Sequence, residues 1–184
     1  EEEKEIVTAY FDKRTVTHSA VVEKINALRK PQINWVNFLD EDFVRAQLSK
    51  LNKNTKPIFG SMNAQQMIEH LSDVTQIANG NWNVDVFVSD TKAARRKPFL
   101  ETKNELQIGF KASFLAEEPD KLKFSSIEES INDLIKQIEI FTTVFMEDKN
   151  RTVVHPFFGE LDFEYWKKFQ VKHFTHHFKQ FNLV

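Results

Sequence analysis

The 184-residue chain contains no cysteine, and this absence excludes several kinds of chemistry. Disulfide bonds, thiolate metal sites, iron–sulfur clusters and cysteine nucleophiles all require the missing thiol. A metal ion in this protein must therefore be held by nitrogen and oxygen ligands.

Glycine is scarce as well, with 4 residues against 18 phenylalanines. This composition favours long, well-packed elements over an all-β chain rich in turns, and it predicts an α-rich protein. No apolar run approaches the roughly 18 residues of a membrane span, and the acidic residues 1–5 do not have the character of a signal peptide. We expect a cytoplasmic protein; because the first residue is not Met, a removed leader stays an alternative.

An excess of one charge is also missing, because 27 acidic residues oppose 25 basic ones and leave a net charge of -2. Both signs are spread along the chain, which argues against nucleic acid or an anionic membrane as a partner. The short basic stretch at residues 92–98 is interpreted as a solvated loop.

Apolar side chains recur at helical spacing in four stretches of residues 40–184, which we predict to be the main domain. Each stretch begins at a side chain suited to capping a helix. The predicted helices start after Asp40, after Asn63 with Gln66 as its capping-box partner, at Ser125 with Glu128 as its partner, and after Asp162. The second is expected at about residues 64–78. The predicted fold class is therefore all-α.

Two stretches do not fit this helical pattern. Residues 1–39 are predicted to be an N-terminal appendage with one helix at about residues 19–28. Residues 81–124 form a long irregular connection between the second and third helices, in which residues 82–88 alternate like an extended segment. A connection of this length is expected to carry a short helix, a lid or part of a substrate pocket.

Three of the six histidines, His173, His176 and His177, lie within five residues near the C-terminal end. On a helix, His173 and His177 project from one face, at a spacing that lets two imidazoles bind one ion. His70 lies on the apolar stripe of the second helix and is the candidate third ligand. A lone inward histidine is usually a satisfied core residue, but three buried imidazoles are difficult to satisfy without a cation or carboxylates. We therefore predict a divalent-metal site.

Three neutral histidine ligands leave further coordination positions open, which is typical of a catalytic site. Zn²⁺ and Ni²⁺ suit such ligands best, with Fe²⁺ and Mn²⁺ behind them. His176 lies about 60° from His173 around the helix. It either replaces a ligand, acts beside the site, or is a partly exposed or helix-packing residue. His155 precedes Pro156 in a stiff loop. It either supports a metal ligand, faces the substrate or is a plain loop residue, and His155 and His176 are the candidates for proton transfer.

Three segments, in this order, resemble the DinB/YfiT-like superfamily, and within it a subfamily of bacterial proteins of unknown function. They are residues 62–71, residues 155–161, and Trp166 followed by His173-x-x-His176-His177-x-x-Gln180. The resemblance covers about residues 40–184. It implies an up-down four-helix bundle with a divalent metal on His70, His173 and His177. Related members include metal-dependent hydrolases and transferases or isomerases that use low-molecular-weight thiols, often as dimers.

The sequence therefore favours a metal-dependent hydrolase or a thiol-dependent transferase that acts on a small-molecule substrate. Its ion would activate a water or a substrate thiol and polarise an electrophile. The alternative is a non-catalytic helical bundle that uses a metal, or packed histidines, for stability or partner binding. An open coordination position that faces a pocket favours the enzyme, and a closed site favours the alternative.

Overall fold

The computed structural model describes residues 33–82, 84, 88–109 and 121–184. Trp35–Val184 form one compact unit, which thus begins a few residues before the domain boundary predicted at residue 40. Val36 and Phe38 are buried in its core. The helix predicted at residues 19–28 and most of the extended segment predicted at residues 82–88 lie outside the described residues.

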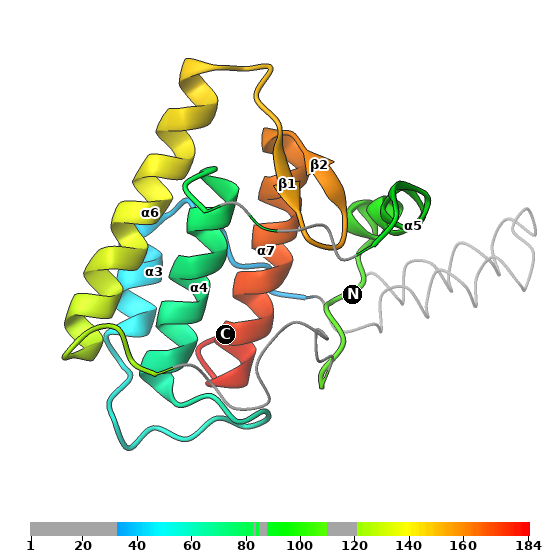
Figure 1. Cartoon of the computed structure of the whole chain (residues 1–184). Coiled ribbons are helices and arrows are strands. Elements are labelled where there is room, and N and C mark those ends of the chain that lie inside the picture. Colours follow the sequence, from blue (N-terminus) through cyan, green and yellow to red (C-terminus); the bar gives the residue numbers. More distant parts are fainter. Residues whose placement is uncertain (1–32, 83, 85–87, 110–120) are drawn as a thin grey trace, which may run out of the picture. The chain divides into compact units, whose positions relative to one another are not determined.

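The compact unit is mostly helical, as the composition predicted (Figure 1). None of the helices in the described residues is long and apolar enough to cross a membrane. The helices are α3 (Glu41–Leu48), α4 (Ala64–Ala78), α5 (Asp90–Arg96), the 3₁₀ helix η1 (Lys97–Glu101), α6 (Ile127–Glu147) and α7 (Phe163–Gln180). The predicted irregular connection therefore contains α5 and η1, and the basic stretch interpreted as a loop is largely helical.

A small sheet corrects the all-α prediction. Strands β1 (Val153–His155) and β2 (Gly159–Leu161) pair antiparallel, with Val153 opposite Leu161 and His155 opposite Gly159. Gly159 has a φ of +69°, a left-handed conformation that glycine adopts without steric cost. The hairpin precedes α7 and positions its first turn, since the Trp166 indole N–H donates to the Val153 carbonyl at 3.0 Å.

Three helices start at the predicted capping residues, and the remaining one starts one residue later than predicted. Asp40 and Asp162 each accept a hydrogen bond from the backbone of the first turn, and Asn63 forms the predicted capping box with Gln66. The prediction at the third helix was wrong by one residue. Ser126, rather than Ser125, caps α6 through the Glu129 amide, because the Ser125 hydroxyl is engaged by the Glu129 carboxylate.

The packing directions of the helices are fixed by hydrogen bonds between them. From α4 to α6, Glu69 contacts Ser130 and Asn79 contacts Gln137, so residue numbers rise together and the two helices run parallel. From α4 to α7 the order is reversed, because Thr75 contacts Gln170 and His70 contacts His173. Figure 1 shows α4 between α6 and α7. The up-down order implied by the resemblance is therefore not observed between α4 and α6, and the long connection returns the chain to the end from which α4 starts.

Phenylalanines fill the core between these helices. Phe38 lies 5.5 Å from Phe141 of α6 and 5.2 Å from Phe174 of α7, measured between ring centroids. All three are fully buried, as is Trp166. Burying one such side chain contributes roughly 1.5–3 kcal/mol, so this aromatic core stabilises the packing of Phe38 between α6 and α7.

A buried carboxylate joins α4 to the segment before α6. Glu69 is 5 % exposed. Its two oxygens accept hydrogen bonds from the Gln65 amide at 2.9 Å, the Lys123 amide at 2.8 Å, the Phe124 amide at 3.3 Å and the Ser130 hydroxyl at 3.1 Å. These four donors satisfy the carboxylate, and they fix the face that α4 turns toward α6. His70 is the next residue, so the same bonds help to fix its direction.

Glu69→Gln is expected to lower the free energy of unfolding by about 2–3 kcal/mol, because one acceptor oxygen becomes an NH₂ donor that faces other donors. Urea denaturation measures this change. Glu128→Gln is the matched control: its side chain is 68 % exposed beside Arg45, and we expect a change within about 0.5 kcal/mol. Equal effects of the two substitutions would contradict the anchoring role of Glu69.

Candidate metal centre

The three histidines predicted as ligands lie together in the structure. Because α4 and α7 run antiparallel, His70 on α4 faces His173 and His177 on α7. The Nε2 atom of His173 lies 3.0 Å from that of His70 and 3.1 Å from that of His177. Within the described ranges, they form a group of potential ligand atoms that all lie within 4.8 Å of one another. The arrangement could hold a metal ion.

The Nε2 spacing fits a divalent ion. With bonds of about 2.0–2.1 Å, adjacent nitrogen ligands of one ion lie roughly 2.9–3.4 Å apart in octahedral or tetrahedral geometry, and both observed contacts fall in this range. Hydrogen bonds explain the contacts less well. His177 donates its Nδ1–H to Gln180, so its Nε2 carries a lone pair, and the single ring proton of a neutral His173 cannot point at both neighbours. A cation between the three nitrogens would satisfy all of them.

Burial keeps two of these imidazoles neutral. His173 and His177 are each 6 % exposed. Burial lowers the pKa of both rings well below the usual histidine range, and the neighbouring imidazoles lower it further. Neutral rings offer the lone pairs that a metal requires. His70 is half-buried, so the centre is nearest to solvent on the α4 side.

His173 is held by packing rather than by hydrogen bonds. Its ring stacks on Phe169 with a centroid separation of 5.3 Å and an interplanar angle of 22°. Its Nδ1 is buried and has no hydrogen-bond partner among the described residues. An orphaned buried polar atom is costly, and a metal bond at Nε2 would offset part of that cost.

His176 lies beside the centre, outside the trio. It is half-buried, and its ring lies 5.1 Å from the His177 ring and 5.1 Å from Phe59. Burial lowers its pKa, while a hydrogen bond to the Leu106 backbone and the charge of Glu105 act in the opposite direction. His176 is therefore in contact with His177, a candidate ligand, and also with Phe59.

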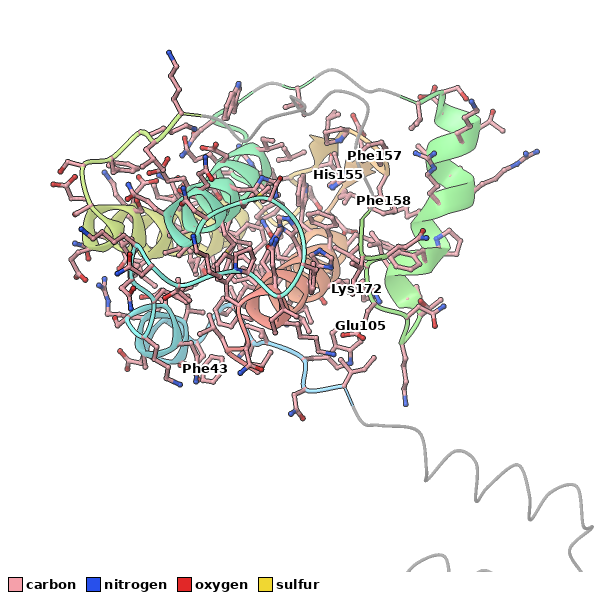
Figure 2. The ribbon with its side chains drawn as sticks, turned by 90° about the horizontal axis from the view of Figure 1, so that it is seen from below. Phe43, Glu105, His155, Phe157, Phe158 and Lys172 are labelled. Atoms are coloured by element: carbon pink, nitrogen blue, oxygen red, sulfur yellow. The ribbon has the colours of Figure 1, made fainter. Side chains whose placement is uncertain are left out.

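His155 lies in an aromatic cluster instead of joining the trio. The cluster consists of Phe157, Phe158, Trp166 and Phe169, with ring centroids 4.3–6.3 Å from that of His155. Figure 2 shows His155 with Phe157 and Phe158 at the hairpin. Its Nδ1 accepts the Phe157 amide proton at 3.0 Å, and burial lowers its pKa to about 3. His155 is therefore a neutral, enclosed ring at physiological pH.

A buried lysine on α7, next in sequence to His173, was not predicted from the sequence. Lys172 is 4 % exposed; it donates to the Thr102 and Asn104 carbonyls at 2.7 and 2.6 Å and lies 4.9 Å from the rings of Trp35 and Phe99. Burial lowers its pKa. With the Lys179–Glu105 ion pair, it ties the segment after η1 to α7 (Figure 2). The segment thereby lies along the α7 face that carries His176.

A cavity of about 590 Å³ lies elsewhere, between the end of α4 and the start of β1. Its lining includes Trp82, Arg151 and Val153, and none of the three histidines. This cavity is therefore not a pocket that the three histidines face, which is the observation that would favour an enzyme.

Comparison with known proteins gives a match over part of the chain and no function. A family model described as a protein of unknown function (DUF1569) matches residues 116–183, which is less than half of the chain. The matched range contains His173 and His177 but not His70. No curated protein and no solved structure matches the chain significantly.

Proposed function

We propose that this protein is a metal-dependent enzyme, either a hydrolase or a thiol-dependent transferase. Its divalent ion is held by the Nε2 atoms of His70, His173 and His177. The observation that carries the proposal is the convergence of these atoms at 3.0 and 3.1 Å. Zn²⁺ and Ni²⁺ suit three imidazoles best, followed by Fe²⁺ and Mn²⁺. When bound, such an ion lowers the pKa of a water or thiol and polarises an electrophile.

The exposure of the three ligands supports an open site. Three histidines leave at least one coordination position for a further group, and His70 is less buried than His173 and His177. A small-molecule substrate, or a low-molecular-weight thiol, would therefore approach from the side of α4.

Of the two residues predicted to transfer protons, His176 is the better placed. It is half-buried and lies next to His177. Burial lowers its pKa, and the Leu106 backbone and the charge of Glu105 oppose this shift. His155 has its Nδ1 occupied by the Phe157 amide and is enclosed by aromatic rings. We assign proton transfer to His176 and a packing role to His155.

The fold that we propose is a four-helix bundle of α3, α4, α6 and α7, related to the DinB/YfiT-like superfamily. Support comes from the three sequence segments that carry the resemblance and from the positions of their histidines on α4 and α7. The parallel packing of α4 and α6 requires a long crossover connection, which residues 81–124 supply.

A non-catalytic metal site is the second candidate. It is favoured by the burial of His173 and His177 and by a cavity whose lining includes none of the three histidines. Such a site would stabilise the contact between α4 and α7 without admitting a substrate.

Metal analysis of the protein, purified without a histidine tag from metal-replete medium, tests the proposal. We expect about one ion per chain; a protein free of stoichiometric metal would overturn it. The two candidates separate when azide or a small thiol is added to cobalt-loaded protein. An open site changes the visible absorption bands, and a closed site leaves them unchanged.

A further inference from the structure

We infer that Gln180 is the positioning residue of the metal centre: its side-chain oxygen holds His177 in the tautomer that presents Nε2 to the ion. This inference rests on the proposed metal site. Gln180 is the last residue of α7, three positions after His177 and so on the same face of the helix. The His177 Nδ1 and the Gln180 Oε1 are 2.8 Å apart.

The direction of this hydrogen bond follows from the other end of the amide. The Gln180 Nε2 lies 2.8 Å from the Phe59 carbonyl oxygen, which can only accept a hydrogen bond. The NH₂ group of Gln180 must therefore face Phe59, and its oxygen must face His177. An oxygen accepts, so the proton of neutral His177 resides on Nδ1 and the lone pair on Nε2. The Phe59 carbonyl thus determines the His177 tautomer through a single amide.

The loop before α4 is built around Gln180. The Ile58 amide donates to the Gln180 backbone carbonyl at 2.7 Å. Gly60 has a φ of +79°, and a Cβ at this position would lie 2.5 Å from the Gln180 Nε2. Only glycine fits this backbone beside the amide. Gln180 is 4 % exposed, and its side-chain oxygen, its NH₂ group and its backbone carbonyl all have partners.

A ligand histidine that donates its second N–H to a fixed acceptor is oriented by that bond and becomes a stronger base at the metal-binding nitrogen. Loss of such a partner typically weakens metal binding about 10–100-fold. Among the trio, His177 has this support, whereas the Nδ1 of His173 has no partner in the described residues. We therefore expect loss of the Gln180 side chain to weaken metal binding although Gln180 is not itself a proposed ligand.

The test compares the zinc affinities of two variants that both lose the hydrogen bond from residue 180 to the Phe59 carbonyl. Gln180→Leu and Gln180→Glu both lose the donor to Phe59, but only the glutamate keeps an acceptor for the His177 Nδ1–H. Zinc affinity is measured by competition with a chromophoric chelator. We expect Gln180→Leu to bind zinc about 10–100-fold more weakly and Gln180→Glu to stay within about 5-fold of the wild type. Gln137→Leu, which removes a buried amide of α6 bonded to Asn79, serves as control and should leave zinc affinity unchanged.

Equal weakening by leucine and glutamate, or no weakening by leucine, would overturn the inference. A second readout needs neither a variant nor a metal. In metal-free wild-type protein, long-range ¹H–¹⁵N spectra of the imidazoles should report His177 protonated at Nδ1, and protonation at Nε2 would overturn the inference. If the wild type binds no zinc, the proposed function fails, and this spectrum still decides the role of Gln180.

Discussion

His173→Ala is expected to abolish stoichiometric metal binding, whereas His176→Ala retains it. His173 is the central candidate ligand, because its Nε2 lies within 3.1 Å of both other Nε2 atoms. Its removal leaves two imidazoles on different helices. We expect the affinity to fall by more than about 100-fold, the upper range for loss of a merely supporting group. Competition with a chelator and elemental analysis measure both quantities.

His176→Ala controls for the general loss of an imidazole, since it removes the neighbouring ring of the same helix without removing a proposed ligand. Thermal unfolding provides an independent measurement. Zinc at 100 times its dissociation constant stabilises the folded wild type by about 2.7 kcal/mol, and the same zinc concentration should leave His173→Ala nearly unaffected. Full metal retention by His173→Ala, or equal loss in the two variants, would place the ion elsewhere.

The three candidate ligands could be predicted because helical periodicity carries the information. The spacing of His173 and His177 places both on one face of α7. The apolar neighbours of His70 place it on the stripe of α4 that faces the core of the protein. Three helix caps could also be predicted, because Asp40, Asn63 and Asp162 each precede an apolar stripe. These predictions depend only on neighbours within a few residues along the chain.

The remaining features depend on contacts that are distant in sequence. The parallel direction of α4 and α6 follows from pairs such as Glu69 with Ser130, 61 residues apart, and periodicity within a helix does not report direction. The hairpin strands have three residues each, too few for an alternating pattern to be recognised. Gln180 could be noticed from its spacing to His177, but its orientation is set by the Phe59 carbonyl, 121 residues away.

The second large effect that we expect is a loss of folding stability at acidic pH, caused by the protonation of His155. In the folded protein burial lowers the pKa of His155 to about 3, whereas an unfolded histidine titrates near 6.5. Between these values the unfolded chain binds a proton that the folded chain does not. The His155 contribution is therefore fully favourable above about pH 6.5 and is lost as the pH falls toward 3. By pH 4.5 the loss amounts to about 3 kcal/mol.

His155→Asn isolates this effect. An asparagine oxygen can accept the amide proton two residues on, as the His155 Nδ1 does for Phe157, but asparagine does not titrate. Urea denaturation of both proteins at pH 7 and pH 4.5, in the presence of a chelator, gives the two pH dependences. Groups that do not interact with His155, such as His177, cancel in the difference. His173 leaves only a small remainder, because the charge of His155 is the smallest of the causes that lower the His173 pKa. The variant should lose about 3 kcal/mol less than the wild type between the two pH values; parallel pH dependences would mean that His155 is protonated in the folded protein as readily as in the unfolded chain.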